Sequence, residues 1–160
     1  MTMPYTLKSA DQQQDFLATP YAEWSDGQFM LAAQLTLDPT TNGGFPSEVQ
    51  PEAVVQLMKV FPCPWLLVES ESGALLCGMN PYNGQEGSLH LAARGFSVHN
   101  AIHLLRHFTD QFPNTQIYAF TIRPPYEAIT RRLGFTLGAR DGEVAIWKRP
   151  MMHHLAAGRN

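Results

Sequence analysis

The clearest hydrophobic pattern of the chain runs from Gly87 to Phe112 and predicts a strand followed closely by a helix. From Gly87 to Ala93 apolar and polar residues alternate, which is typical of a half-buried strand. After a break at residues 94–97, apolar residues return at helical spacing and share one sector of the helix: Val98, Ala101, Ile102, Leu105, Phe108 and Phe112. We therefore expect a strand, a tight turn and a helix in direct succession.

The N-terminal residues predict a first strand and a first helix. The strand is expected at Pro4–Ala10, and Ser9 or Asp11 could cap the helix that follows. That helix is expected to include Gln12, Phe16 and Leu17.

Two further helices and a long loop are expected next. The helices are predicted at Gln28–Leu37 and Pro51–Phe61, where Pro51 suits a first helical turn. Between them, Asp38–Pro51 is rich in proline, glycine and small polar residues, which predicts a loop. A loop of this length often borders a functional site.

The rest of the chain predicts first a hairpin, formed by Trp65–Glu69 and Ala74–Met79. A strand at Gln116–Ile122 and a short helix at Tyr126–Leu133 are expected next. A second hairpin is expected from Phe135–Leu137 and Val144–Lys148. Pro124 and Pro125 should open the short helix and Gly134 should end it. This order of elements predicts an α+β fold, with a mostly antiparallel sheet flanked by helices and one parallel βαβ element. We expect a single domain over residues 1–150 and a C-terminal tail over 151–160.

Composition narrows the class of protein. With 44% hydrophobic and 16% charged residues the 160-residue chain should fold as a globular protein, and its net charge of −3 gives no reason to expect nucleic acid as a partner. No secretory leader and no apolar run of membrane-spanning length is visible, so we expect a soluble cytoplasmic protein with no membrane partner. Cys63 and Cys77 are isolated and are expected to be buried and reduced.

The charges are unevenly distributed along the chain. Residues 1–93 carry a net charge of −8 and residues 94–160 a net charge of +5, with eight arginines among the nine basic residues of the second part. The expected turn also places the backbone N–H groups of Ser97 to Asn100 at the positive end of a helix dipole, which suits a phosphate. An ordinary strand–helix corner and a solvated basic face are the alternatives.

Three segments of the chain resemble the GNAT superfamily of N-acetyltransferases. These are the strand–turn–helix segment, the sequence RPPYEAITRRLGF at residues 123–135, and the opening YTLKSADQQQDF. In that family the strand runs into a turn of the form Arg/Gln-x-x-Gly-x-Gly/Ala, whose N–H groups hold the pyrophosphate of acetyl-CoA. The resemblance implies a GNAT-like fold, acetyl-CoA as cofactor, and a set of cofactor-binding residues: Leu91, Ala92, Arg94, Ser97, Val98, His99, Asn100 and Arg123.

The chain departs from this family at several positions. Ser97 and His99 stand where the turn of the family has its two small residues. The family often has a tyrosine on the short helix as general acid to the CoA thiolate, and here that position is Thr130. Tyr126 lies one helical turn earlier and could replace it. Arg123 stands where the family frequently has asparagine.

The chemistry of acetyl transfer requires a base for the amine. His90 and Glu86, on the strand before the turn, are the candidates, with a plain hydrogen-bonded or exposed residue as the alternative for His90. The acceptor would be the amine of a small molecule or a protein, held between Asp38–Pro51 and the turn at residues 82–86. The acidic N-terminal part of the chain would favour a cationic acceptor.

Other interpretations remain open at this stage. His99, His103 and His107 recur every four residues and could share a metal, although a polar helix face explains them as well and no metal site is predicted. The chain could also be a GNAT-shaped interaction or structural protein without catalysis, of the kind that phages encode, or an unrelated α+β binding domain. A monomer or a homodimer is expected.

Overall fold

The computed structural model describes residues 3–38, 48–61 and 63–152. Eight strands form one sheet in the order β1-β2-β3-β4-β5-β6-β8-β7. All neighbouring strands are antiparallel except β5 and β6, which are parallel and joined through a helix. This confirms the predicted α+β class with a parallel element inside an antiparallel sheet. The strands cover Tyr5–Lys8 (β1), Asp15–Pro20 (β2), Trp65–Glu69 (β3), Ala74–Pro81 (β4), Glu86–Arg94 (β5), Gln116–Thr121 (β6), Thr136–Asp141 (β7) and Val144–Arg149 (β8).

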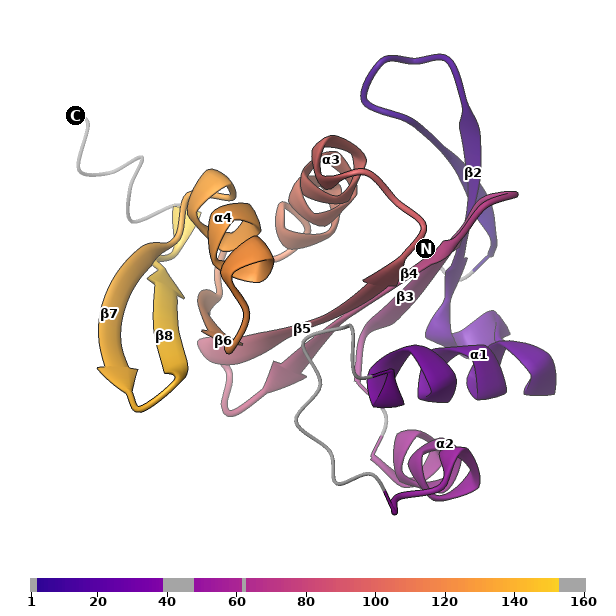
Figure 1. The fold of residues 1–160 in the computed structure, drawn as a ribbon, viewed down its shortest axis with the longest axis horizontal. Coiled ribbons are helices and arrows are strands. Elements are labelled where there is room, and N and C mark those ends of the chain that lie inside the picture. Colours follow the sequence, from indigo (N-terminus) through magenta and orange to yellow (C-terminus); the bar gives the residue numbers. More distant parts are fainter. Residues whose placement is uncertain (1–2, 39–47, 62, 153–160) are drawn as a thin grey trace.

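Four α-helices cover the two faces of the sheet (Figure 1). Helices α1 and α2 lie on one face and helices α3 and α4 on the other, so the sheet separates two apolar cores. The helices cover Asp26–Leu37 (α1), Pro51–Val60 (α2), Val98–Thr109 (α3) and Pro124–Arg132 (α4), and a short 3-10 helix spans Tyr21–Glu23. Most predicted elements are therefore confirmed to within a few residues.

The first predicted helix is wrong, because the residues from Asp15 onward form strand β2. Phe16 and Ala18 are buried while Leu17 is 48% exposed, which is the period-two alternation of a strand and not that of a helix. Strand β2 pairs with β1 on one side and with β3 on the other. These pairings bury Phe16 in the core.

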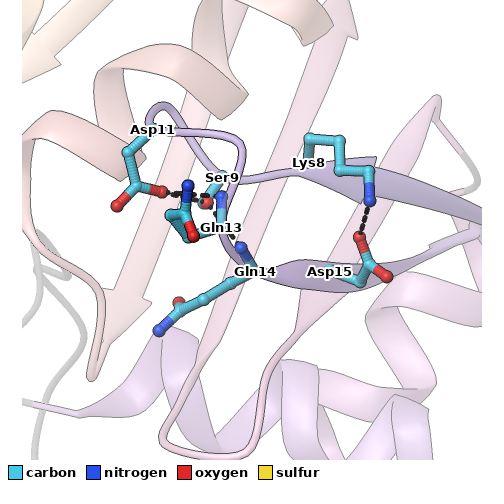
Figure 2. A network of polar contacts seen from close by, with 6 residues as sticks. All are labelled: Lys8, Ser9, Asp11, Gln13, Gln14 and Asp15. Carbon is cyan, nitrogen blue, oxygen red and sulfur yellow. Dashed lines mark hydrogen bonds and ion pairs between the residues drawn. The ribbon is translucent and has the colours of Figure 1, made fainter.

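The polar residues expected to cap that helix close the β1–β2 turn (Figure 2). The hydroxyl of Ser9 donates to the carboxylate of Asp11 at 2.6 Å, and the backbone N–H of Gln13 donates to the same carboxylate at 3.0 Å. Gln12 has a positive φ of 65°, which breaks any helix at this point. Lys8 and Asp15 face each other across the first rung of the hairpin and form an ion pair.

Helices α1 and α2 bury their apolar faces in the core on their side of the sheet. Helix α1 starts with a capping box between Ser25 and Gln28, and buries Ala32, Ala33 and Leu35.

Two predicted segments lie mostly outside the described residues. The predicted loop between α1 and α2 falls largely on residues 39–47, and the predicted tail falls largely on residues 153–160.

The strand–turn–helix segment forms as predicted, with Ser97 as the N-cap of α3. The hydroxyl of Ser97 accepts from the backbone N–H of Asn100 at 3.1 Å. The apolar face of α3 is buried through Ala101, Ile102 and Leu105, whereas Val98 in the first turn is 45% exposed. Helix α4 begins at Pro124 and Pro125 and ends at Arg132, and Gly134 just beyond it has a φ of +93°, as expected of a helix-terminating glycine.

Candidate functional site

The two parallel strands separate halfway along β5. Strand β5 pairs with β4 from Gly87 to Arg94, but it pairs with β6 only from Glu86 to Leu89. Beyond the Leu89–Ala119 pair, the described residues of β5 form no further pairs with β6, so this edge of β5 is unpaired there. Two pockets lie next to this stretch, one on each face of the sheet.

The first pocket, here called the α2 pocket, lies between helix α2 and the sheet and has a volume of about 500 Å³. Its lining is mostly apolar, and its polar side chains come from α1, β4 and β5. The lining residues are Thr36, Val54, Leu57, Met58, Phe61, Cys63, Trp65, Asn80, Ser88, Leu89, His90, Leu91 and Phe120. A volume of this size suits a small organic ligand.

Two lining residues of the α2 pocket, Trp65 and His90, belong to a row of three residues across the sheet. Trp65 on β3 pairs with Gly78 on β4, which pairs with His90 on β5. The indole ring of Trp65 covers Gly78 so closely that a Cβ there would come within 2.3 Å of the ring. The rings of Trp65 and His90 meet edge to face, with centroids 5.3 Å apart and planes at 84°. The isolated glycine inside a strand is the one signal in the sequence for this close approach, and by itself it does not identify Trp65 or His90 as the neighbours.

Burial controls the protonation of the titratable groups in the α2 pocket. Desolvation lowers the pKa of His90 to about 4, so its imidazole is neutral at pH 7 and can accept a proton or a hydrogen bond. Desolvation also raises the pKa of Cys63 to about 12, which keeps its thiol protonated. Of these two side chains in the lining, only His90 can therefore accept a proton at neutral pH.

Glu86, the other candidate base, lies outside the lining of the α2 pocket. Its carboxylate accepts from the hydroxyl of Tyr118 at 2.9 Å and from the amide of Asn83 at 3.3 Å. The hydrogen bond to Glu86 raises the pKa of Tyr118. Glu86 and His90 lie on the same face of β5, but four residues of strand separate them by about 13 Å. The structure therefore does not bring the two candidate bases to one point.

The second pocket, here called the α3–α4 pocket, lies on the opposite face of the sheet and has a volume of about 380 Å³. The first turns of both helices line it, together with Arg123, the N-cap residue of α4. Its lining residues are Ala93, Phe96, Val98, Ala101, Arg123, Pro124, Pro125, Tyr126 and Ile129. Two helix N-termini and an arginine favour an anion at its mouth, although Pro124 and Pro125 contribute no N–H donors.

Several residues of the predicted phosphate turn are engaged elsewhere. The guanidinium of Arg94 pairs with the carboxylate of Asp38 at the end of α1, with an N–O distance of 3.2 Å. The backbone N–H of Asn100 donates to the hydroxyl of Ser97. The side-chain oxygen of Asn100 accepts from the backbone N–H of Ala10 at 2.9 Å, which ties α3 to the β1–β2 turn.

Of the eight predicted cofactor residues, Val98 and Arg123 line the α3–α4 pocket. Leu91 lines the α2 pocket instead, Ala92 is buried in the core beside α1 and α2, and His99 is exposed.

The structure separates the roles open to Tyr126 and Thr130. Tyr126 is buried and lines the α3–α4 pocket. The hydroxyl of Thr130 donates to the backbone carbonyl of Tyr126 at 2.7 Å, within the helix. The hydroxyl of Thr130 is therefore committed to a backbone carbonyl, and of these two residues only Tyr126 lines the α3–α4 pocket.

The histidine stripe of α3 shows no arrangement suited to a metal. Among residues 3–38, 48–61 and 63–152, no three His, Cys, Asp or Glu side chains gather as a group that could hold a metal ion. His107 instead contacts the hydroxyl of Tyr5 at 3.4 Å and the amide of Gln111 at 3.2 Å.

Among residues 3–38, 48–61 and 63–152, none of the helices is both long and apolar enough to span a membrane.

Comparison with known proteins identifies the fold. No protein-family model and no curated protein sequence matches the chain. Among solved structures, a chimera of spermidine N-acetyltransferase from Vibrio cholerae and hSSAT aligns at a TM-score of 0.64 and 14% identity, over 86% of this chain and 98% of that chain. The GNAT domain of S. lividans PAT aligns at a TM-score of 0.64 and 10% identity, over 91% of this chain and 96% of that chain.

A third solved structure, the ribosomal-protein-S5-alanine acetyltransferase from Vibrio fischeri, aligns at a TM-score of 0.57 and 10% identity, over 93% of this chain and 97% of that chain. Each alignment covers nearly the whole of the other chain, and the shared architecture is the mixed sheet with helices on both faces. The chain therefore has the fold of the GNAT N-acetyltransferases.

Proposed function

We propose that this protein is an acetyl-CoA-dependent N-acetyltransferase that transfers the acetyl group directly to an amine. One observation carries the proposal: two pockets on opposite faces of the sheet adjoin the stretch of β5 that β6 leaves unpaired. Ligands bound in the two pockets would meet at this edge. The similarity to N-acetyltransferases of known structure supports the same assignment.

The α3–α4 pocket is the proposed site for the cofactor. Its apolar wall, with Ala93, Phe96 and Ile129, suits a mainly uncharged chain, and Arg123 with the first turn of α3 suits a phosphate. Acetyl-CoA, when bound, supplies an acetyl group activated as a thioester. We assign the phosphate contact to Arg123, because it lines this pocket, whereas Arg94 lies outside the lining.

The residues around the edge of β5 would divide the proton transfers between them. The amine nitrogen, held in the α2 pocket, attacks the acetyl carbonyl carbon, and the bond from that carbon to sulfur breaks. His90 accepts the proton that the amine loses, directly or through water, and Tyr126 supplies a proton to the departing sulfur. Backbone N–H groups on the unpaired edge of β5 would polarise the carbonyl.

A second candidate function is that of a GNAT-shaped protein without catalysis. It is favoured by the ion pair between Arg94 and Asp38, by the cap that Ser97 places on the N–H of Asn100, and by the prolines that begin α4. Together these features reduce the number of donors available to a pyrophosphate. The two functions differ in whether acetyl-CoA binds.

Thermal denaturation with and without acetyl-CoA tests the proposal. A ligand present at a hundred times its Kd should stabilise the fold by about 2.7 kcal/mol, which is a measurable shift in Tm. We expect Arg123→Ala to reduce the shift and the matched variant Arg94→Ala to retain it. If millimolar acetyl-CoA leaves the Tm of the wild-type protein unchanged, the protein is not an acetyltransferase and the second candidate function takes its place.

A further inference from the structure

The lining of the α2 pocket is apolar to a degree that limits which amine it can hold. Eight apolar side chains form most of it, contributed by helix α2 and its C-terminal end and by strands β3, β5 and β6: Val54, Leu57, Met58, Phe61, Trp65, Leu89, Leu91 and Phe120. At its mouth Leu57, Phe61 and Phe120 are 52%, 70% and 43% exposed. Large apolar side chains exposed at the rim of a pocket indicate an apolar ligand or substituent.

Charge is missing from the same lining. None of the described residues of the α2 pocket is Asp, Glu, Lys or Arg. The carboxylates of Glu86 and Asp38 lie outside this lining and bind Tyr118 and Arg94. A cationic amine would have to give up its hydration here without an anionic partner, which is costly.

The polar groups that remain in the pocket match an uncharged amine. Among the described residues, the indole N–H of Trp65 is buried without a hydrogen-bond partner, and the ring of His90 meets the ring of Trp65 edge to face. A neutral imidazole offers one donor and one acceptor, so it can hydrogen-bond an uncharged amino group. It is too weak a base to remove a proton from an alkylammonium ion efficiently.

We propose that the α2 pocket selects an aromatic amine, whose nitrogen is attached to the ring and is uncharged at neutral pH, and that it rejects alkylammonium ions and polyamines. This inference rests on the proposed function for the identity of the pocket as the acceptor site. It differs from the cationic acceptor that the acidic N-terminal part of the sequence suggested. The ring would lie against Trp65 and the apolar side chains of α2, with the amino group beside His90 at the edge of β5.

A pair of isomers provides the test. 4-Ethylaniline and 2-phenylethylamine contain the same atoms, but at neutral pH only the second is charged. Isothermal titration calorimetry, with and without CoA, should show 4-ethylaniline binding at least about tenfold more tightly than its isomer, a difference of about 1.4 kcal/mol. Spermidine should not bind. Equal or tighter binding of 2-phenylethylamine or spermidine would overturn the inference, as would no binding of either isomer at millimolar concentration.

Two matched variants of helix α2 test the pocket through a change in amine specificity, which a general loss of structure would not produce. Leu57→Asp places a carboxylate in the lining at a position that is already 52% exposed. Val60→Asp places the same group three residues later on the same helix, at a position 64% exposed and outside the lining. We expect Leu57→Asp to bring the affinities for the two isomers together or to reverse them, and Val60→Asp to leave the wild-type ratio. The same ratio in both variants would contradict the assigned pocket.

Binding and acetyl transfer are measured separately, so that the two proposals can fail separately. If 4-ethylaniline binds selectively but no acetylated product forms with acetyl-CoA, the specificity of the pocket is upheld and the transferase function is excluded. If product forms faster from spermidine or 2-phenylethylamine than from 4-ethylaniline, the transferase function is upheld and the inference about the amine is wrong.

Discussion

Gly73 and Gly95 lie directly against each other where the β3–β4 turn meets the end of β5. A Cβ on Gly73 would come within 2.7 Å of the Cα of Gly95, and a Cβ on Gly95 would come within 2.8 Å of the Cα of Gly73. Gly95 also has a φ of +79°, which side chains with a Cβ rarely adopt. The glycine of the turn at residues 94–97 is therefore required by packing and by its backbone conformation.

Replacement of Gly95 by alanine should destabilise the fold strongly. The new Cβ would lie 2.2 Å from the carbonyl oxygen of Ser72, and the positive φ adds backbone strain. We expect a loss of about 3 kcal/mol or more in the free energy of unfolding, measured by chemical denaturation. Gly142→Ala is the matched control, because Gly142 has a φ of +62° with nothing within 4 Å of a Cβ. It should cost only about 1 kcal/mol, and equal losses for both variants would show that the contact with Ser72 is unimportant.

Arg149 holds the end of helix α3 from inside the protein. Its side chain is 4% exposed and donates to the backbone carbonyls of Thr109 at 3.2 Å and of Phe112 at 2.9 Å. Arg149→Met keeps an unbranched apolar stem but loses both charge-assisted hydrogen bonds, and we expect it to cost about 2–3 kcal/mol in urea denaturation. Lys148→Met, at the exposed neighbouring position, should change stability by less than about 0.5 kcal/mol. A loss as large in Lys148→Met would contradict the capping role.

The neutral state of His90 predicts how stability depends on pH. The pKa of His90 is about 4 in the folded protein and 6.5 is the ordinary value, so the unfolded chain binds the proton more tightly. The contribution of neutral His90 to the free energy of unfolding is complete above pH 6.5 and is lost as the pH falls toward 4. Between pH 7 and pH 5 we expect His90 to account for a loss of about 2 kcal/mol in the free energy of unfolding.

The variant His90→Gln should remove this part of the pH dependence, whereas His99→Gln, at an exposed position, should retain it. Chemical denaturation at both pH values measures the effect. Direct titration of the His90 ring by NMR provides an independent reading, and a midpoint near 6.5 in the folded protein would refute the prediction.

The two hydroxyls of helix α4 should differ in their effect on acetyl transfer. Tyr126→Phe removes the proposed proton donor to sulfur and should lower kcat by about a hundredfold, with little change in KM for acetyl-CoA. Thr130→Val removes a hydroxyl that is bonded to the carbonyl of Tyr126, and should change kcat far less. A larger effect of Thr130→Val on kcat would exchange the roles of the two residues.

The sequence by itself determined most of the local structure. The alternation at Gly87–Ala93 and the helical spacing that follows it predicted β5 and α3, and Gly134 predicted the end of α4. These signals are reliable because they depend on interactions between residues close in the chain, or on one face of an element buried against any core. The resemblance to the GNAT fold came from the same segments.

Only the tertiary structure decided the features that depend on residues distant in the chain. Phe16 belongs to a strand because β1 and β3 are available to pair with its neighbours, which outweighs the capping potential of Ser9 and Asp11. Arg94 meets Asp38, and Trp65 meets His90 across Gly78, because the sheet brings separate segments into register. Which side chains line a pocket, and which are already paired, is set by packing between elements, and no periodicity along the chain records it.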